Sequence, residues 1–351
     1  MFARQDVANE LDKKLFRTRK RLLLTAYLIV LLCRISYSII EAQLPFRKTS
    51  TCKEFKKNLK EFEVKHKQAR GSGAIKRPIV TFSGLGHQGR LGNQLFQIAA
   101  TIGIAEAHGY PWDFLEDISM CAAGRLFNLC GGLNRSRPFA IYKEGSEVYH
   151  KINLTELQNH EVISLSGYFQ DYQYFHQSLV SLSMYLDFPY SLINKVRSRV
   201  PELDSFSVAL HVRRGDYENL NALYNLLNED YYLRALSLID ESIDNVIIVS
   251  DDVSWCMKHL APRIPYNIIF SQFKDDDLSD FLLLHLSKVI IIANSSFSWW
   301  AAFLKYVRSD LKMFDTNVRV FAPAEWYNSS GALAYLNRDS FLPPLWTRVP
   351  I

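Results

Sequence analysis

Six consecutive residues at the end of one apolar run carry a histidine, two arginines and an aspartate. The run SFSVAL leads into HVRRGD, which contains His211, Arg213, Arg214 and Asp216. The planar guanidinium of arginine binds phosphate oxygens in pairs and stabilises the charge that develops on a leaving diphosphate. Side chains alternate along a strand, so Arg213 shares a face with His211 while Arg214 points to the other face. The residues predict either an anion site in which Asp216 pins one arginine, or a salt-bridge cluster on the surface.

Two further polar groups follow apolar runs later in the chain. Asp251 and Asp252 close the run NVIIVS, and their carboxylates are able to accept hydrogen bonds from a guanine edge or a ribose hydroxyl. The alternative for this pair is an N-cap of the helix that follows. Ser296, Phe297 and Ser298 lie between a predicted strand and a predicted helix, where hydroxyls and free backbone N–H groups form an anion pocket.

A glycine-rich segment, GHQGRLGNQ over residues 86–94, opens another predicted helix. Glycine lets a backbone approach a ligand closely, which makes Arg90 and Asn93 candidate site residues. The segment lacks the GxGxxG spacing of dinucleotide-binding proteins, so its glycines alone do not identify a ligand.

Strands alternate with helices along the part of the chain that carries these residues. Apolar periodicity predicts helices that include 230–239, 277–289 and 295–307, and apolar runs predict strands over 78–84, 161–169, 205–216, 245–252 and 290–294. This alternation favours an α/β fold with parallel sheets whose faces are covered by helices. Ligands of such sheets bind at the carboxyl ends of the strands, where the polar residues stand here.

The N-terminal quarter predicts a membrane topology. A basic segment, residues 1–21, precedes an apolar stretch over 22–40 that Arg34 interrupts. The positive-inside rule puts 1–21 in the cytosol, 22–40 across the membrane as a type II signal-anchor, and 41–77 in a Lys-rich stem before a lumenal domain over 78–351. One alternative is a cleaved signal peptide, which requires small residues after the apolar run. The other is a buried core helix, which fits badly with so basic a flank.

Charge is distributed unevenly over the chain, whose formal net charge is +5. Residues 1–21 carry +4 and residues 47–77 carry +8, which leaves residues 78–351 acidic at −7. Because the basic residues stand in the tail and stem, the sequence argues against nucleic-acid binding. Its 48% hydrophobic residues exclude a disordered or collagen-like chain, and its length suffices for two lobes, roughly 78–200 and 201–351.

Four N-x-S/T sequons agree with a lumenal domain. Asn134, Asn153 and Asn328 lie in polar or turn-like stretches and are predicted to carry glycans. Asn294 lies between a predicted buried strand and a helix, and is predicted to stay unmodified.

Five cysteines occur, one of them in the apolar stretch. The other four, Cys52, Cys121, Cys130 and Cys256, allow three full pairings. The short Cys121–Cys130 loop is the pairing that the sequence favours, with buried free thiols as the alternative.

No spacing typical of a metal site is present, because the chain has neither CxxC nor HExxH. The acidic run Asp275–Asp277 stands at a predicted helix start, where the helix dipole favours carboxylates, so we interpret it as a cap rather than a metal ligand.

Taken together, these segments resemble the α-1,2-fucosyltransferase family. The matching segments follow one another over most of 78–351: GRLGNQLFQIA, SGYFQDYQYF, LHVRRGDY, DYYLRAL, VIIVSDD, NSSFSWWAA and FAPAEWY. The short anchor, the stem and the lumenal domain also resemble a Golgi glycosyltransferase. The chain departs from the compact Gly-Gly-Leu-Gly-Asn form of the family at His87-Gln88, which leaves the roles of His87 and Arg90 and the acceptor open.

The resemblance implies a GT-B-like fold of two Rossmann-like lobes, GDP-fucose as donor, inversion at the anomeric carbon and no required metal or other cofactor. It implies that Arg213 contacts the donor diphosphate and that His211 and Arg214 shape the pocket. The remaining donor-site candidates are Asp216, Asp251, Asp252, Ser296, Phe297, Ser298, Asn93 and Arg90.

We therefore expect a Golgi type II enzyme that transfers L-fucose from GDP-fucose to a galactose or related hydroxyl of a glycan on glycoprotein or glycolipid. Two alternatives stay open. One is a fucosyltransferase of another linkage, and the other is a lumenal protein that binds glycans or nucleotide sugars without catalysis. The paired arginines argue against the second, since a binder does not need to stabilise a leaving diphosphate.

Overall fold

The computed structural model describes residues 77–146, 148–310, 318–337 and 341–351, all of which lie in one compact unit, 56–351. The predicted cytosolic tail, the signal-anchor and all of the stem except Arg77 lie outside the described residues. Of the helices that the described residues form, none has the length and apolar character needed to cross a bilayer.

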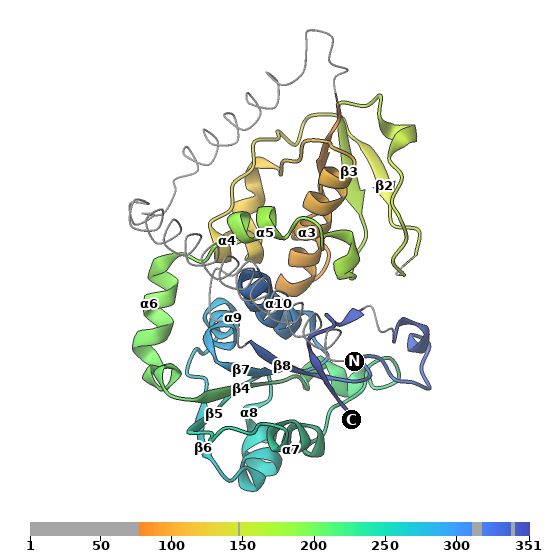
Figure 1. Ribbon diagram of the computed structural model, residues 1–351. Helices are drawn as coiled ribbons and strands as arrows, with labels where there is room; N and C mark the ends of the chain where they lie inside the picture. Colours follow the sequence, from red (N-terminus) through yellow and green to blue (C-terminus); the bar gives the residue numbers. More distant parts are fainter. Residues whose placement is uncertain (1–76, 147, 311–317, 338–340) are drawn as a thin grey trace, which may run out of the picture. The chain divides into compact units, whose positions relative to one another are not determined.

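The described residues form strands and helices in alternation (Figure 1). The strands are β1 (Ile79–Thr81), β2 (Ala140–Lys143), β3 (Val162–Ser166), β4 (Ser207–Val212), β5 (Asn245–Ser250), β6 (Asn267–Phe270), β7 (Val289–Ile291), β8 (Arg319–Pro323) and β9 (Thr347–Val349). The α-helices are α3 (Leu91–Ala107), α4 (Ala122–Phe127), α5 (Leu179–Tyr185), α6 (Tyr190–Arg199), α7 (Glu229–Ser237), α8 (Val253–Trp255), α9 (Asp277–Leu286) and α10 (Ser296–Asp310).

The strands build two sheets whose neighbouring strands are all parallel. The smaller sheet has the order β1-β3-β2, and the larger has the order β6-β5-β4-β7-β8-β9. The predicted α/β fold with parallel sheets is therefore confirmed. The crossovers between parallel strands are long connections that carry most of the helices.

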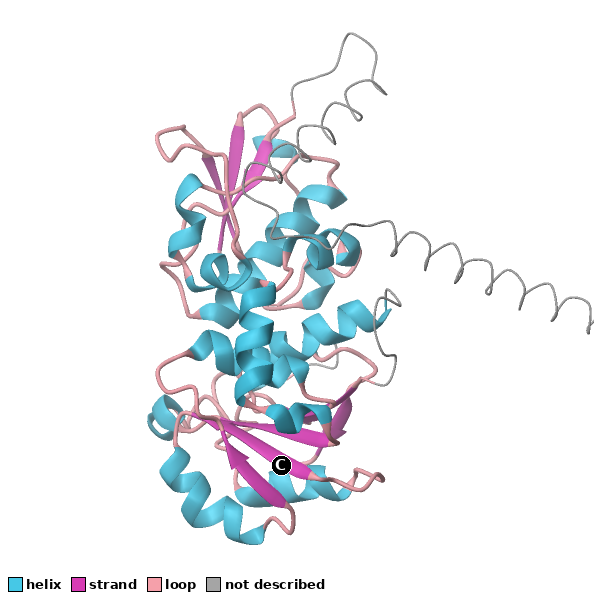
Figure 2. Ribbon diagram, turned by 90° about the vertical axis from the view of Figure 1, so that its left-hand side faces the viewer, coloured by secondary structure: helices cyan, strands magenta, loops and turns pink. Residues whose placement is uncertain are grey.

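The larger sheet is buried on both faces. All six residues of β4 are buried, and helices cover both sides of this sheet (Figure 2). Alternate residues such as Val208 and Leu210 pack into one apolar cluster with Tyr231 of α7 and Ile248 of β5. A strand covered on both faces is apolar without alternation, which explains the runs seen in the sequence.

The boundaries near the end of the larger sheet differ from those predicted. Helix α9 ends at Leu286 instead of residue 289, because Ser287 adopts an extended backbone and its Oγ donates to Leu283 O at 2.9 Å. The strand that follows is β7, which ends at Ile291, so Asn294 and Ser295 lie in a connection.

Helix α6, which the predicted lobe boundary assigns to 78–200, packs against α9 of the later segment. Lys195 Nζ of α6 lies 2.5 Å from Asp276 Oδ2, the N-cap residue of α9. The boundary at residue 200 stays a prediction.

The predicted Cys121–Cys130 disulfide is wrong. Cys121 is a free thiol, and its Sγ accepts a hydrogen bond from Gly124 N at 3.3 Å as the N-cap of α4. Burial raises the pKa of Cys121. The sequence spacing gave no sign that this cysteine starts a helix, because cysteine is not one of the usual N-cap residues.

Candidate active site

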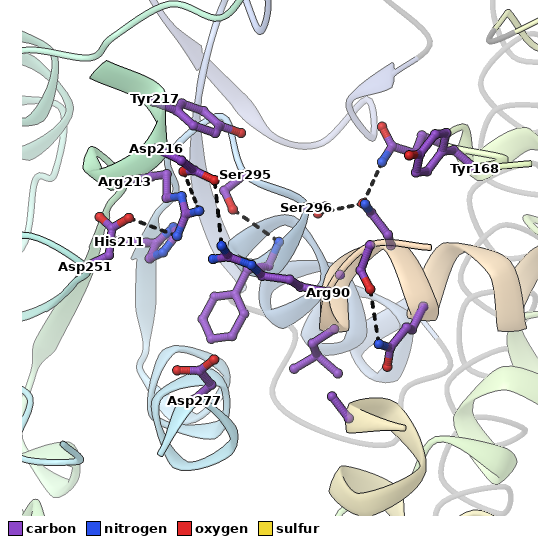
Figure 3. A pocket seen from close by; sticks show the side chains of 18 of the residues that line it. Arg90, Tyr168, His211, Arg213, Asp216, Tyr217, Asp251, Asp277, Ser295 and Ser296 are labelled. Carbon is purple, nitrogen blue, oxygen red and sulfur yellow. Dashed lines mark hydrogen bonds and ion pairs between the residues drawn. The ribbon is translucent and has the colours of Figure 1, made fainter. Parts of the chain in front are cut away.

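A cavity of about 1120 Å³ opens at the carboxyl ends of β4, β5 and β7, facing the N-terminus of α3 (Figure 3). The predicted site residues that line it are Arg90, Asn93, His211, Arg213, Asp216, Asp251, Ser296 and Phe297. These residues come from segments up to about 200 positions apart in the chain, and the carboxyl edge of the larger sheet supplies most of them, as expected for a parallel sheet.

Arg213 is fixed from several sides at the end of β4. Its Nη2 donates to Asp216 Oδ1 at 2.5 Å, and its Nη1 lies 2.9 Å from Asp251 Oδ2. The guanidinium carbon also lies 5.5 Å from the ring centre of Tyr217. The Arg213 side chain is only 17% exposed, so the pairings hold a partly buried charge at the cavity wall. An added Cβ on Gly215 would lie 2.5 Å from Asp251 Oδ2, so a larger residue there would displace the carboxylate that pairs with Arg213.

His211 lies next to Arg213 at the cavity wall and is buried there as a neutral imidazole. Its Nδ1 shares a 2.8 Å hydrogen bond with Ser298 Oγ, and burial, with Arg213 nearby, lowers the pKa of His211 to about 3. Ser298 Oγ also lies within hydrogen-bond distance of the carbonyls of Ala293 and Ser295. Because the hydroxyl has these carbonyl acceptors, we infer that Nδ1 carries the imidazole proton and donates it to Ser298.

Three predicted donor-site residues do not line the cavity. Arg214 points to the other face of β4, where it stacks 4.0 Å from the ring centre of Trp255 and pairs with Glu218 at 3.0 Å. Asp252 is the N-cap of α8 and accepts from Trp255 N, as the helix-cap alternative predicted. Ser298 is fully buried against His211. These three residues support residues that line the cavity, and their contact with the donor stays a prediction.

The N-termini of two long helices meet at the cavity. An added Cβ on Gly92, in the first turn of α3, would lie 2.4 Å from the carbonyl carbon of Ser296, the first residue of α10. Asn93 Oδ1 accepts hydrogen bonds from Ser296 Oγ at 3.1 Å and from Gln170 Nε2 at 2.7 Å. The positive ends of two helix dipoles therefore point into one region.

Arg90 is the other cationic candidate. Its side chain is 79% exposed, and its Nη2 lies 3.9 Å from Asp216 Oδ2. At this distance and exposure the pair contributes little stability, so Arg90 is available to an anion in the cavity.

An acidic arm of the cavity lies on the side of β5 and α9, lined by Asp251, Asp275, Asp276, Asp277 and Asp280. Asp276 accepts from Ser279 N at 3.2 Å as the N-cap of α9, which confirms the interpretation of this run as a cap. Burial raises the pKa of Asp280 to about 6. Within the described residues, no group of three or more His, Cys, Asp or Glu side chains is arranged to hold a metal ion.

Aromatic residues that the sequence analysis did not select also line the cavity. Tyr217 stacks on Tyr224 with ring centres 4.7 Å apart, and Tyr224 contacts Tyr327 at 5.4 Å. Tyr168 lines the wall that comes from the smaller sheet. SGYFQDYQYF had marked Tyr168 as part of a segment of interest, but nothing in the sequence indicated its neighbours in space.

The sequons fall into two groups. Asn294 is fully buried, and its Nδ2 donates to Asn225 O at 2.8 Å and Trp326 O at 2.9 Å. Asn134 and Asn153 are exposed. Asn328 is half-buried, and its Nδ2, the atom that a glycan would occupy, donates to Asn221 O at 2.8 Å.

Comparison with known sequences gives one family and two relatives. The profile of a family described as Glycosyl transferase family 11 matches residues 142–319. An Escherichia coli protein named Alpha-1,2-colitosyltransferase is 34% identical over 157 residues, which cover 41% of this chain and 47% of that protein. The Escherichia coli O-antigen biosynthesis glycosyltransferase WbnK is 27% identical over 216 residues, covering 57% of this chain and 67% of that protein. The matched region thus spans about half the length of the first relative.

Among solved structures, this chain is similar to the fucosyltransferase NodZ from Bradyrhizobium, with a TM-score of 0.45 and 13% identity over 66% of this chain and 94% of that chain. It is also similar to POFUT1 in complex with GDP, with a TM-score of 0.43 and 11% identity over 67% of this chain and 96% of that chain. At this level of similarity no property of these proteins is transferred to the chain.

Proposed function

This chain belongs to glycosyl transferase family 11, and we propose that it transfers L-fucose from GDP-fucose to a galactose or related hydroxyl of a glycan, in α-1,2 linkage and with inversion. The resemblance of HVRRGD, NSSFSWW and their companion segments to α-1,2-fucosyltransferases supports the donor and the inversion. The name of the 34% identical relative, Alpha-1,2-colitosyltransferase, supports the linkage.

The position of Arg213 is the observation that carries this proposal. Its guanidinium is held rigidly at the cavity wall by Asp216 and Asp251, in the region where the N-termini of α3 and α10 converge. A donor fixed in advance stabilises charge that develops in the transition state without reorganising during the reaction. The departing diphosphate of GDP is the group in the proposed reaction that gains such charge.

Charge balance gives Arg90 a part in the same step. Asp216 and Asp251 together offset Arg213 and Arg90, so the four side chains have no net charge before the donor binds. The N-termini of α3 and α10 then supply the additional positive potential that a diphosphate requires. With these groups the chain needs no metal ion at the diphosphate.

The acidic arm beside β5 suits the nucleoside of the donor. Guanine presents N–H donors on one edge, and ribose presents hydroxyls, so carboxylates such as Asp251 and Asp277 are matched acceptors. Inversion then requires one displacement, in which the acceptor hydroxyl attacks the anomeric carbon opposite to the departing GDP. A carboxylate that lines the cavity takes the hydroxyl proton.

The proposal includes a setting in the cell and an overall arrangement. We place the lumenal domain, 78–351, in the Golgi behind a type II anchor over 22–40, on the basic flank of that stretch. We also propose that the two parallel sheets correspond to the two lobes of a GT-B fold, with the site between them.

The test uses the full chain, purified in detergent, with GDP-fucose and lactose in excess EDTA. The expected product is lactose that carries α-fucose on O2 of its galactose, identified by NMR, with one GDP released per transfer. Fucose on another hydroxyl of lactose would favour the alternative of a fucosyltransferase with a different linkage. Loss of transfer in EDTA that added metal ions restore would refute the metal-free diphosphate site. Binding of GDP-fucose without transfer to lactose or to any glycan of an array would favour the non-catalytic alternative.

A further inference from the structure

The turn that follows β3 has an unusual backbone. Gly167 has a φ of 151°, and Phe169 has a φ of 50° although it is not glycine and is completely buried. A bulky residue in the left-handed region carries a cost of order 1–3 kcal/mol, and such residues persist only where the surroundings hold them in place. The residue between these two, Tyr168, is therefore presented by a backbone that other contacts must maintain.

Glu144 supplies those contacts. Its carboxylate accepts the backbone N–H of Tyr168 at 2.7 Å and that of Phe169 at 3.0 and 3.1 Å. An added Cβ on Gly167 would lie 2.5 Å from Glu144 Cβ, so glycine is needed there for the carboxylate to approach. A carboxylate that accepts two backbone N–H groups makes strong, charge-assisted hydrogen bonds, which fix the turn.

The turn is also tied to the donor side of the cavity. Gln170 Nε2 donates to Asn93 Oδ1 at 2.7 Å, and the same oxygen accepts from Ser296 Oγ at 3.1 Å. The turn that carries Tyr168 is thus coupled through the side chains of Gln170 and Asn93 to Ser296, the first residue of α10, where the diphosphate is proposed to bind.

Tyr168 is 43% exposed and lines the cavity on the side opposite Arg213 (Figure 3). Its hydroxyl makes no hydrogen bond to another described residue. An aromatic ring offers an apolar face and, in tyrosine, a polar handle at its edge. The exposed Tyr168 ring therefore suits a ligand that has an apolar face and hydroxyl groups around its edge. A pyranose sugar ring has both features.

We propose that Tyr168 is the platform on which the acceptor sugar stacks, and that Glu144 is the positioning residue that presents it. This inference rests on the proposed function. The donor diphosphate and nucleoside are assigned to the wall built by β4, β5, α9 and α10, whereas Tyr168 comes from the smaller sheet. A single displacement requires the acceptor on the side opposite to the leaving GDP, and Tyr168 occupies that side.

The first experiment measures initial rates of the full-chain enzyme and its Tyr168→Ala and Tyr168→Phe variants, with lactose and GDP-fucose varied in turn. Tyr168→Ala should raise KM for lactose about tenfold and leave KM for GDP-fucose within about twofold. Tyr168→Phe keeps the ring face and should stay within about threefold of wild type for lactose. The control is Tyr190→Ala, an exposed tyrosine at the start of α6 that does not line the cavity, which should change neither constant.

The results separate the two proposals. Absence of transfer by wild type from GDP-fucose to lactose and to every glycan of an array would refute the proposed function and this inference with it. Normal transfer with an unchanged lactose KM in Tyr168→Ala would refute only the inference. A rise confined to KM for GDP-fucose would also overturn it, because the ring would then stack on the guanine, which aromatic side chains bind equally well.

The role of Glu144 is tested by a double-mutant cycle. Glu144→Gln leaves one oxygen for two N–H groups, so it should raise KM for lactose by a smaller factor than Tyr168→Ala. If Glu144 acts through Tyr168, adding Glu144→Gln to Tyr168→Ala should raise that KM no further. Independent, multiplying effects in the double variant would show that Glu144 does not act by positioning Tyr168.

Discussion

The Nδ1 atom of His211 lies 2.8 Å from the Oγ atom of Ser298 and joins the end of β4 to the first turn of α10. Burial, with Arg213 nearby, lowers the pKa of His211 to about 3, so this contact is made by a neutral imidazole. Because the ring is neutral, it does not repel the positive charge of Arg213, which the proposed leaving-group role requires.

This burial predicts how stability changes with pH. Below the unfolded pKa of about 6.5, the unfolded chain binds a proton at His211 that the folded chain does not bind, so stability falls as pH falls from 6.5 towards 3. At pH 5.0 the loss from this one group is about 2 kcal/mol. His211→Asn should reduce the difference in unfolding free energy between pH 7.5 and pH 5.0 by that amount, measured by urea denaturation.

The matched control is His176→Asn, because His176 is an exposed histidine. It should leave the pH dependence as in wild type. An unchanged pH dependence in His211→Asn as well would mean that His211 is not kept neutral by the fold.

Gly92 is predicted to be essential for the meeting of α3 and α10. An alanine Cβ there would lie 2.4 Å from Ser296 C and 2.7 Å from Phe297 N, both of them backbone atoms that cannot rotate away. Gly92→Ala should cost about 1–3 kcal/mol of stability and should raise KM for GDP-fucose, measured by denaturation and initial rates. Gly145→Ala is the control, since an added Cβ there meets nothing within 4 Å. The same stability and the same KM for GDP-fucose in both variants would contradict the close approach of α3 to α10 at Gly92.

Arg214 is predicted to stabilise the fold rather than bind the donor. Its side chain is 10% exposed, pairs with Glu218 and stacks on Trp255. Removing it takes away the stacking on Trp255 and leaves the buried carbonyl oxygen of Leu227, which accepts from Arg214 Nη1 at 3.3 Å, without this donor, so Arg214→Ala should lower the free energy of unfolding by about 1–3 kcal/mol. At a temperature where the variant is folded, its KM for GDP-fucose should be close to that of wild type. Glu218→Gln, at the exposed end of the pair, should cost well under 1 kcal/mol. A stable Arg214→Ala variant with a strongly raised KM for GDP-fucose would show instead that Arg214 binds the donor.

Glycan mapping tests the environment of the sequons. When the chain is expressed in the secretory pathway of a eukaryotic cell, glycopeptide mass spectrometry should find glycans at Asn134 and Asn153. It should find none at Asn294, whose side chain is fully buried. Asn294→Gln should leave the glycosidase-sensitive mass unchanged. Loss of one glycan in that variant would show that the segment is exposed. Asn328, which is half-buried, stays predicted to carry a glycan, since a glycosylated Nδ2 keeps one N–H for the hydrogen bond to Asn221 O.

Much of the larger sheet follows from local sequence. The apolar runs that became β4 and β5 are long and end in polar residues, and period-two alternation correctly turned Arg213 and Arg214 to opposite faces. Because all strands are parallel, their polar ends had to meet at one edge, so His211, Arg213, Asp251 and Ser296 could be grouped before any coordinates were known.

Contacts between distant segments could not be predicted in this way. Asn93 and Ser296 stand 203 residues apart, and only the packing of α3 on α10 brings them within 3.1 Å. Glu144 and Tyr168 are joined through backbone N–H groups, which leave no trace in side-chain type or spacing. The predicted Cys121–Cys130 disulfide is wrong for a related reason. A short spacing in sequence does not ensure pairing, because pairing depends on where the two side chains point, and Cys121 is directed by the helix that it starts.

The most direct test of the account is the turnover of Arg213→Ala at saturating GDP-fucose and lactose, in protein shown by thermal melting to be folded. The loss of a group that stabilises the leaving diphosphate should lower kcat by about 10² to 10³-fold, and Arg213→Lys should restore only part of it, because lysine keeps the charge without the paired donors. If folded Arg213→Ala turns over within about threefold of wild type, with the cost confined to KM for GDP-fucose, then Arg213 is not the residue that stabilises the leaving group.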